Sequence, residues 1–207
     1  MVWLSLALIF SLGTPAAVDR EASSYLQQGR FQDADKLCRT ALAAFETAYG
    51  PDSLETALML KDLTLAYRGE GFLKKAEKSA QRSVTILQQR LGPDDANVAL
   101  ALDQLAEINF NQHRYTEARR LLRLALSTAE RALGPDHPHV ATILNDLAAV
   151  YHVEHHYAEA ESLYRRALAI REKTLPPDHP YVTVIRQNLA ELDRPHGRKS
   201  AAVLALR

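Results

Sequence analysis

Apolar residues recur at helical spacing along most of the chain, in paired segments that are separated by short polar turns. Between residues 140 and 151 they stand three or four positions apart, and a second run of this kind covers residues 160–168. Such spacing places the apolar side chains on one face of an α-helix. The stretch HVEHH at residues 152–156 lacks this periodicity and predicts a tight turn. The pattern therefore predicts a hairpin of two amphipathic helices.

This hairpin repeats every 42 residues. The tripeptide GPD occurs at residues 50–52, 92–94 and 134–136, and PPD follows at residues 176–178. A single hairpin cannot bury its own apolar face, so successive hairpins are expected to stack as an all-α solenoid. Three further columns keep the same step: identical alanines (Ala34, Ala76, Ala118, Ala160), large apolar residues (Phe31, Leu73, Tyr115, Tyr157) and small residues (Ala41, Ser83, Ala125, Ala167).

The GPD stretches read as linkers between hairpins. Glycine and proline end one helix, and Asp136 or His137 is expected to cap the next, with Pro138 in its first turn. Ser53 and Asp95 stand where His137 stands, and both are capping residue types. Within the hairpins, Gly29 and Gly71 suit a left-handed helix end. Because His155 shares their column, the helix before it is expected to end there.

The third hairpin has apolar and small residues at a characteristic set of positions: Leu144, Leu147, Ala148, Tyr151, Tyr157, Ala160, Tyr164 and Ala167. In this spacing it resembles a tetratricopeptide repeat (TPR). The 42-residue period, the LGPDHP linkers and the segment RALAIREKTLPPDHP at residues 166–180 are similar to the longer variant found in kinesin light chains. The resemblance covers about residues 19–194. It implies a right-handed superhelical solenoid of antiparallel helix pairs with a concave groove for ligands, and names no partner.

The N-terminus indicates an export signal. Residues 2–12 are uncharged and apolar but too short to span a bilayer as a helix. Small residues at Thr14 and Ala16 and then charges follow, which predicts a cleaved signal over residues 1–16 and a secreted or periplasmic protein. No second apolar stretch predicts stable membrane insertion. Because no Lys or Arg precedes the apolar run, an apolar first helix in a cytoplasmic protein stays open as the alternative.

The repeat array is predicted over residues 18–194, with its first helix starting near Val18. Three full helix pairs with incomplete ends are expected, followed by a solitary capping helix near residue 194. A tail or short capping helix takes up residues 195–207. The expected repeats cover about residues 18–50, 51–92, 93–134, 135–176 and, in part, 177–194.

Composition narrows the range of functions. Lys plus Arg and Asp plus Glu both total 25, so the formal net charge is zero and no basic field favours nucleic acid. Cys38 is the single cysteine, so no disulfide can form within the chain. It shares a column with Tyr164, which predicts a buried structural thiol.

Histidines are the only candidates for metal chemistry. His152, His155 and His156 lie in the predicted turn, and His137 and His139 lie in a linker. A helix end at His155 would point these side chains apart, so solvated turn histidines are favoured over the alternative of a histidine metal site. No nucleophile elbow, phosphate-binding loop or dinucleotide fingerprint occurs. The sequence predicts no catalytic residues, no metal and no cofactor, and no enzyme.

The remaining candidate for a functional site is the surface of the repeats. By its columns, the resemblance implies that the first helix of each pair contributes residues to a groove that binds a protein or extended peptide, with Phe110 as an apolar anchor. Only Lys61 and Arg68 are basic there, so an anionic ligand is not favoured. A structural module that stacks on copies of itself through open array ends is the alternative function. The predicted positions, together called the groove face below, are Lys61, Leu65, Arg68, Asp103, Glu107, Phe110, Asn145, Ala149, His152, Gln187 and Glu191.

Overall fold

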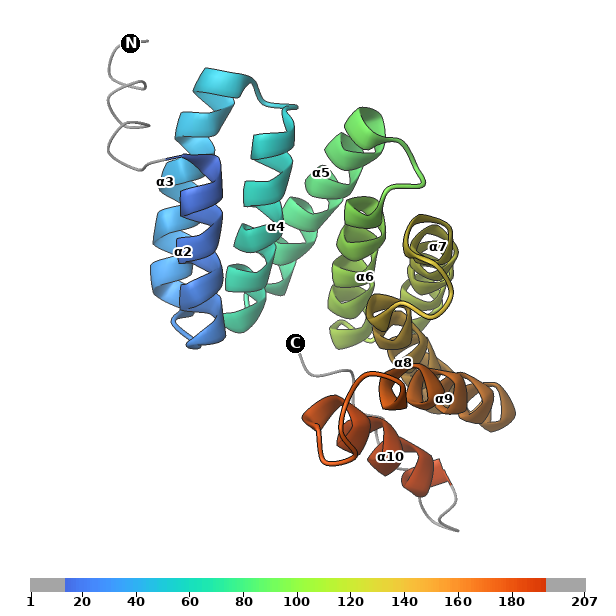
Figure 1. Cartoon of the computed structure of the whole chain (residues 1–207). Helices are drawn as coiled ribbons and strands as arrows, with labels where there is room; N and C mark the ends of the chain where they lie inside the picture. Colours follow the sequence, from blue (N-terminus) through green and yellow to red (C-terminus); the bar gives the residue numbers. More distant parts are fainter. Residues whose placement is uncertain (1–13, 193–207) are drawn as a thin grey trace. The chain divides into compact units, whose positions relative to one another are not determined.

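The computed structural model describes residues 14–192, and every regular element in this range is an α-helix (Figure 1). The helices form four antiparallel pairs and one further helix, α10. The pairs are α2 (Pro15–Gln27) with α3 (Phe31–Tyr49), α4 (Leu54–Gly69) with α5 (Leu73–Leu91), α6 (Ala96–Asn111) with α7 (Tyr115–Leu133), and α8 (Pro138–Val153) with α9 (Tyr157–Glu172); α10 covers Pro180–Leu192.

Two expectations about the ends of the array need correction, and the predictions for the two termini lie mostly outside the described residues. Four full helix pairs are present in residues 14–192 rather than three, because the first pair is complete. Its first helix begins at Pro15 instead of near Val18, since Thr14 caps it by accepting from the amide of Ala17. Ala16 therefore lies in the first turn of α2. Most of the predicted signal, residues 1–13, and the predicted tail, residues 195–207, lie outside the described residues.

The turn inside each hairpin uses a left-handed residue at one recurring column. Gly29 and Gly71 have φ angles of 70° and 79°, as their residue type suggests. His113 and His155 occupy the same column with φ angles of 60° and 66°. The predicted end of the helix before His155 is confirmed, because α8 ends at Val153.

The linkers between hairpins are capped by the predicted residues. The side chains of Ser53, Asp95 and His137 each accept a hydrogen bond from a backbone amide of the helix that follows. Pro138 is the first residue of α8, where its missing N–H leaves no intrahelical bond unmade. The interpretation of the GPD stretches as capped linkers is therefore confirmed.

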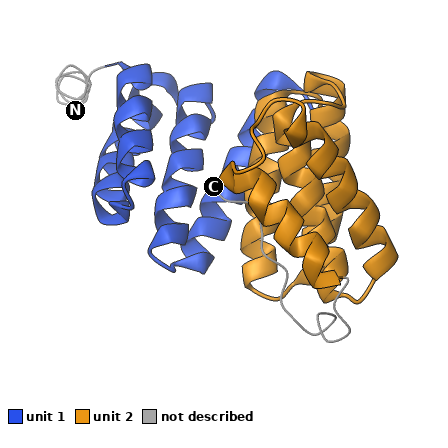
Figure 2. Cartoon of the chain, turned by 60° about the horizontal axis from the view of Figure 1, so that its bottom comes forward, with its two compact units in different colours: residues 1–93 blue, residues 94–207 orange. Residues whose placement is uncertain are grey.

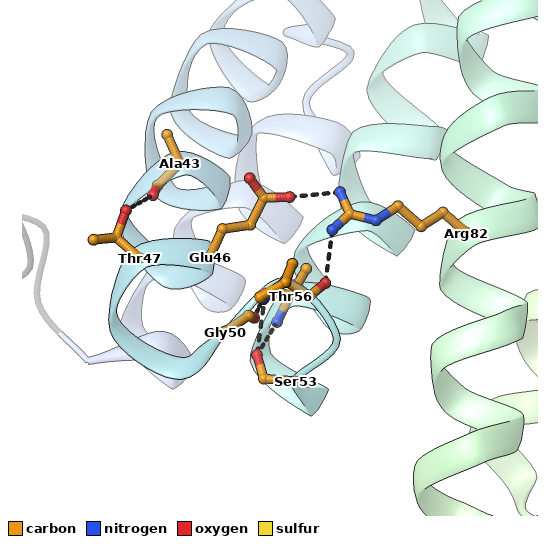
Figure 3. A network of polar contacts seen from close by, with 8 residues as sticks. Ala43, Glu46, Thr47, Gly50, Ser53, Thr56 and Arg82 are labelled. Atoms are coloured by element: carbon orange, nitrogen blue, oxygen red, sulfur yellow. Dashed lines mark hydrogen bonds and ion pairs between the residues drawn. The ribbon is translucent and has the colours of Figure 1, made fainter.

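An arginine from the second helix of the next pair holds the first linker in place (Figure 3). Arg82 of α5 forms an ion pair with Glu46 of α3, and its guanidinium also donates to the carbonyl oxygen of Pro51 at 2.6 Å. Inside the linker, the Thr56 hydroxyl donates to the carbonyl oxygen of Gly50 at 2.9 Å. These bonds join the end of α3, the linker and α5, and they are called the linker clamp below.

The two arginine bonds of the linker clamp recur at two later linkers. Arg166 of α9 pairs with Glu130 at 2.6 Å and donates to the carbonyl oxygen of Pro135 at 3.4 Å. At the last described linker, Arg186 of α10 takes the same two kinds of partner, Glu172 at 2.6 Å and the carbonyl oxygen of Pro177 at 3.1 Å. The second linker differs, because Gln88 and Leu124 stand in the glutamate and arginine columns and cannot form this ion pair. Leu124 is 38% exposed.

The chain divides into two compact units at this second linker (Figure 2). Unit 1 covers residues 1–93 and contains α2 to α5; unit 2 covers residues 94–207 and contains α6 to α10. In unit 1, α2 and α3 both pack against α4. In unit 2, α8 packs against α6, α7, α9 and α10. The two units are described separately below.

Each unit buries the small residues of the repeat columns between its helices. Ala34 and Ala76 are buried in unit 1, and Ala118 and Ala160 are buried in unit 2. Small side chains at these positions let paired helices approach closely and bury the larger apolar residues around them. Tyr164 is fully buried in unit 2, and Cys38, in the same column, is fully buried in unit 1. The prediction of a buried structural thiol is confirmed.

Candidate functional site

In unit 1, α4 carries the three predicted groove-face residues. Lys61, Leu65 and Arg68 are all half-buried. The ammonium of Lys61 lies 3.9 Å from Asp19 Oδ1 of α2 and 3.7 Å from Asp62 Oδ1 of its own helix. Lys61 is therefore held between two carboxyl groups, and its charge is largely engaged within the unit. This strengthens the sequence-based argument against an anionic ligand at this face.

In unit 2, the predicted residues lie on α6, α8 and α10, and α8 contacts both of the other two helices. Gln187 is exposed, and Glu107, Phe110 and Glu191 are half-buried. The remaining four were expected at the surface and are buried instead: Asp103, Asn145, Ala149 and His152.

Packing explains the burial of the α8 residues. Because α8 is the middle one of the three first helices, the side chains that it turns towards this face meet neighbours on both sides. Asn145 accepts a hydrogen bond from the amide of Asn188 on α10 at 3.2 Å, and it donates to Asp146 at the same distance. The amides therefore form a buried polar connection between α8 and α10, a structural role that column spacing does not indicate.

Phe110 is less available as an anchor than the sequence suggests. Its ring makes an edge-to-face contact with Tyr115 of α7, with centroids 5.3 Å apart. The ring thus packs the end of α6 against the start of α7. The exposed part of the ring is what remains for a partner.

Two of the first helices of unit 2, α6 and α8, are acidic. Neither α6 nor α8 contains Lys or Arg, whereas they carry Asp103, Glu107 and Asp146. The pKa of Tyr164 is raised, first by burial and then by the negative charges of Asp146 and Glu191. The arginines of this unit lie mainly on α7 and α9, the second helices of the pairs.

The histidines divide into two groups. His155 and His156 are exposed, as predicted for turn residues, and the Nδ1 atom of His155 is 2.7 Å from the Tyr157 hydroxyl. His152 was predicted to lie in the same solvated turn, but it is a buried residue of α8, in edge-to-face contact with Tyr157. The helix continues past it because the left-handed residue comes three positions later. Among residues 14–192, no three His, Cys, Asp or Glu side chains gather in a way that could hold a metal ion.

A cleft of about 530 Å³ on unit 2 was not predicted from the sequence. Leu147 and Tyr151 of α8 form its floor, and residues of α7 and α9 form its walls. Arg123 stands at one wall with its guanidinium donating to the Tyr151 hydroxyl, and Glu159 stands at the other. The lining comes from three helices, and each contributes positions that read as ordinary helix packing in the sequence. No local motif could have indicated it.

The part of the chain that the structure describes holds no helix that is both long and apolar enough to cross a membrane.

Comparison with known protein families identifies the type of repeat. The tetratricopeptide repeat model matches residues 15–89, 96–173 and 141–207, which together cover most of the chain. The chain belongs to the tetratricopeptide repeat family. This confirms the resemblance inferred from the 42-residue columns, and repeats of this family generally mediate protein–protein interaction and are generally non-catalytic. A search of curated proteins finds no match.

Solved structures show the same fold. A kinesin light chain-like protein of Podosopora anserina with nearly identical TPR-like repeats is 22% identical, with a TM-score of 0.74 over 89% of this chain and 87% of that one. BtubC (BKLC) from P. vanneervenii is also 22% identical, with a TM-score of 0.73 over 92% of this chain and 78% of that one. PilF of Pseudomonas aeruginosa is 20% identical, with a TM-score of 0.64 over 86% and 67% of the two chains. These similarities confirm an all-α repeat solenoid of the kinesin light chain-like kind.

Proposed function

We propose that this TPR protein is an adaptor or scaffold that binds a peptide or protein partner through the groove-face residues on the first helices of its repeats. The observation that carries the proposal is the family itself, because its repeats generally bind proteins and the chain contains little besides repeats. The fold does not name the partner, which the side chains at the site must select.

The accessible residues of the groove face support an extended polar ligand. Arg68 and Glu107 are half-buried and Gln187 is exposed, and all three carry side chains that can bond to a peptide backbone or its polar groups. The residues that are buried, such as Asn145, shape and stiffen the face instead of contacting a partner. A stiff face loses little entropy on binding, which favours affinity.

Selection from a random peptide library displayed on phage tests the proposal. The full chain is immobilised, and enriched peptides are measured by fluorescence anisotropy against the wild type and a variant with Arg68→Ala, Glu107→Ala and Gln187→Ala. We expect the triple variant to bind at least about tenfold more weakly, because a few central contacts carry most of the binding energy.

A matched variant on the second helices serves as the control. Lys78→Ala, Glu161→Ala and Gln89→Ala likewise remove one cationic group, one carboxylate and one side-chain amide, from α5 and α9. Both variants are first shown to keep the helical circular dichroism and the melting temperature of the wild type. If the control loses binding and the groove-face variant keeps it, binding occurs elsewhere, with the cleft at Tyr151 as the next site to examine.

We further propose that the protein is exported and acts outside the cytoplasm, on the basis of the apolar residues 2–12 and the small residues that follow. Mass spectrometry of the intact protein, recovered from medium or periplasm, measures its N-terminal residue. A start close to residue 17 supports export, and an uncut chain found only in the cytoplasm contradicts it.

A further inference from the structure

A buried carboxyl group lies where the first helix of unit 1 meets the rest of that unit. Asp62 of α4 is 1% exposed, and its Oδ2 atom has no hydrogen-bond partner among the described residues. The ammonium of Lys61 is 3.7 Å from the other oxygen, Oδ1, and 3.9 Å from Asp19 Oδ1 of α2. Two carboxyl groups on neighbouring helices therefore share one cation.

The surroundings of Asp62 contain few other charges. Helix α2 contributes Asp19, and α4 contributes Lys61. Helix α3 contributes the thiol of Cys38. The pKa of this thiol is raised first by burial and then by the negative charges of Asp62, Asp35 and Asp19. Helix α5, which also packs against α4, buries only uncharged residues. Negative groups thus outnumber the single ammonium, so the charged form of Asp62 is poorly compensated in this packing.

Burial raises the pKa of Asp62 from its ordinary value to about 7; Lys61 opposes the rise and the Asp19 carboxylate adds to it. Below this value Asp62 is neutral while α2 is docked. Once α2 leaves, water reaches the carboxyl group and its pKa returns towards the ordinary range near 4. The docked state therefore binds a proton that the undocked state releases at neutral pH.

The same contact covers the only cysteine of the chain. Val18 and Ala22 of α2 form one buried apolar cluster with Cys38 of α3 and with Met59 and Leu63 of α4. Cys38 is fully buried, and burial raises the pKa of its thiol. A reagent in solution can reach this sulfur only when the cluster opens, and the departure of α2 opens it.

We propose that protonation of Asp62 controls the docking of α2 on α4, so that ionisation of this carboxyl group loosens α2 and separates Asp19 from the groove-face residue Lys61. Asp19 of α2 and Lys61 of α4 form an ion pair between the two helices, and this pair is lost when α2 undocks. A partner that needs both helices would then bind more strongly to the protonated protein.

The direction follows from linkage. A carboxyl group with a raised pKa in the docked state favours docking fully below its undocked pKa, and this support is lost as pH rises towards the docked pKa. From about pH 4 to about pH 7 the docking equilibrium weakens by at most roughly tenfold per pH unit, which is about a thousandfold in all. Above about pH 7 Asp62 is ionised in both states, so its titration no longer changes the docking equilibrium.

Cys38 reports on the opening directly. The full chain is treated with a thiol reagent at a series of pH values, and the labelling rate is divided by the rate for the Asp62→Asn variant at the same pH, which cancels the titration of the thiol itself. We expect this ratio to rise at least about tenfold between about pH 5 and about pH 8, with Asp19→Asn giving a smaller rise. A ratio that stays constant with pH overturns the proposal.

Hydrogen exchange distinguishes release of α2 from global unfolding. Amides in residues 15–27 are expected to exchange faster at high pH, after correction for intrinsic rates, while those of α4 and α5 keep their protection. Equal loss of protection throughout unit 1 contradicts a local switch. Neither outcome depends on a partner, so the peptide selection above can fail while this proposal stands, and the reverse also holds.

Discussion

Single residues in this chain carry roles that differ from those of their column mates. At the left-handed turn position, histidine replaces glycine in two of four repeats, and each histidine ring then bonds a tyrosine hydroxyl two residues later, at 2.8 Å for Tyr115 and 2.7 Å for Tyr157. The imidazole bond offsets part of the strain that a side chain suffers at positive φ. In the column of Cys38 and Tyr164, a thiol and a phenol occupy equivalent positions, and both are fully buried.

Tyr164 offers a test of burial at this scale. Its hydroxyl is buried and has no hydrogen-bond partner among the described residues, so Tyr164→Phe removes an unsatisfied polar group at little loss of volume. We expect the variant to be equally stable or up to about 1 kcal/mol more stable in urea unfolding. Tyr157→Phe is the matched control: it removes the hydroxyl bonded to His155 and should lower stability by roughly 0.5–1 kcal/mol. A large loss of stability in Tyr164→Phe would show that its hydroxyl is bonded after all.

At the scale of elements, the linkers are structured parts of the fold. In three of four linkers an arginine reaches back to a glutamate at the end of the preceding pair and to a proline carbonyl. The last of these arginines comes from α10 itself, since no second helix follows within the described residues. The linker without the arginine and the glutamate is the one at which the chain divides into two units.

The linker clamp predicts a stability difference between the half-buried Arg82 and the exposed Arg165. Arg82→Ala breaks an ion pair and a charge-assisted bond that join α3, the linker and α5, and we expect a loss of about 1 kcal/mol in the free energy of unfolding. Arg165→Ala, which removes a pair within α9, should cost less than about 0.5 kcal/mol. Chemical denaturation measures both. Equal effects would mean that the linker clamp contributes no more than a pair on one helix surface.

At the scale of the whole molecule, the oligomeric state distinguishes a binding module from a self-assembling module. The formal net charge is zero, so long-range repulsion does little to keep copies apart. A binding module that acts alone should nevertheless be a monomer, since its function needs the groove face and not the ends of the array.

Multi-angle light scattering over a wide range of concentration tests this expectation. For the full chain we expect the mass of one copy, 23.1 kDa, at every concentration. A mass that grows steadily with concentration would favour the self-stacking module instead, because open repeat ends make contacts that do not close into a ring.

The sequence by itself determined the repeat, its 42-residue period, the helix caps at Ser53 and Asp95, and burial of the thiol of Cys38; it left Asp136 and His137 open as the third cap. These follow from local rules, since a cap or an amphipathic stripe depends on neighbours within one or two turns of the same helix. Only the tertiary structure decided which polar positions are accessible. Asn145 and His152 read as surface residues in their own helix but are buried because α8 lies between two other first helices. The same reason hides Asp62 from the sequence: its burial and the single cation that it shares with Asp19 arise from contacts between helices. The spacing of residues along one helix does not indicate such contacts.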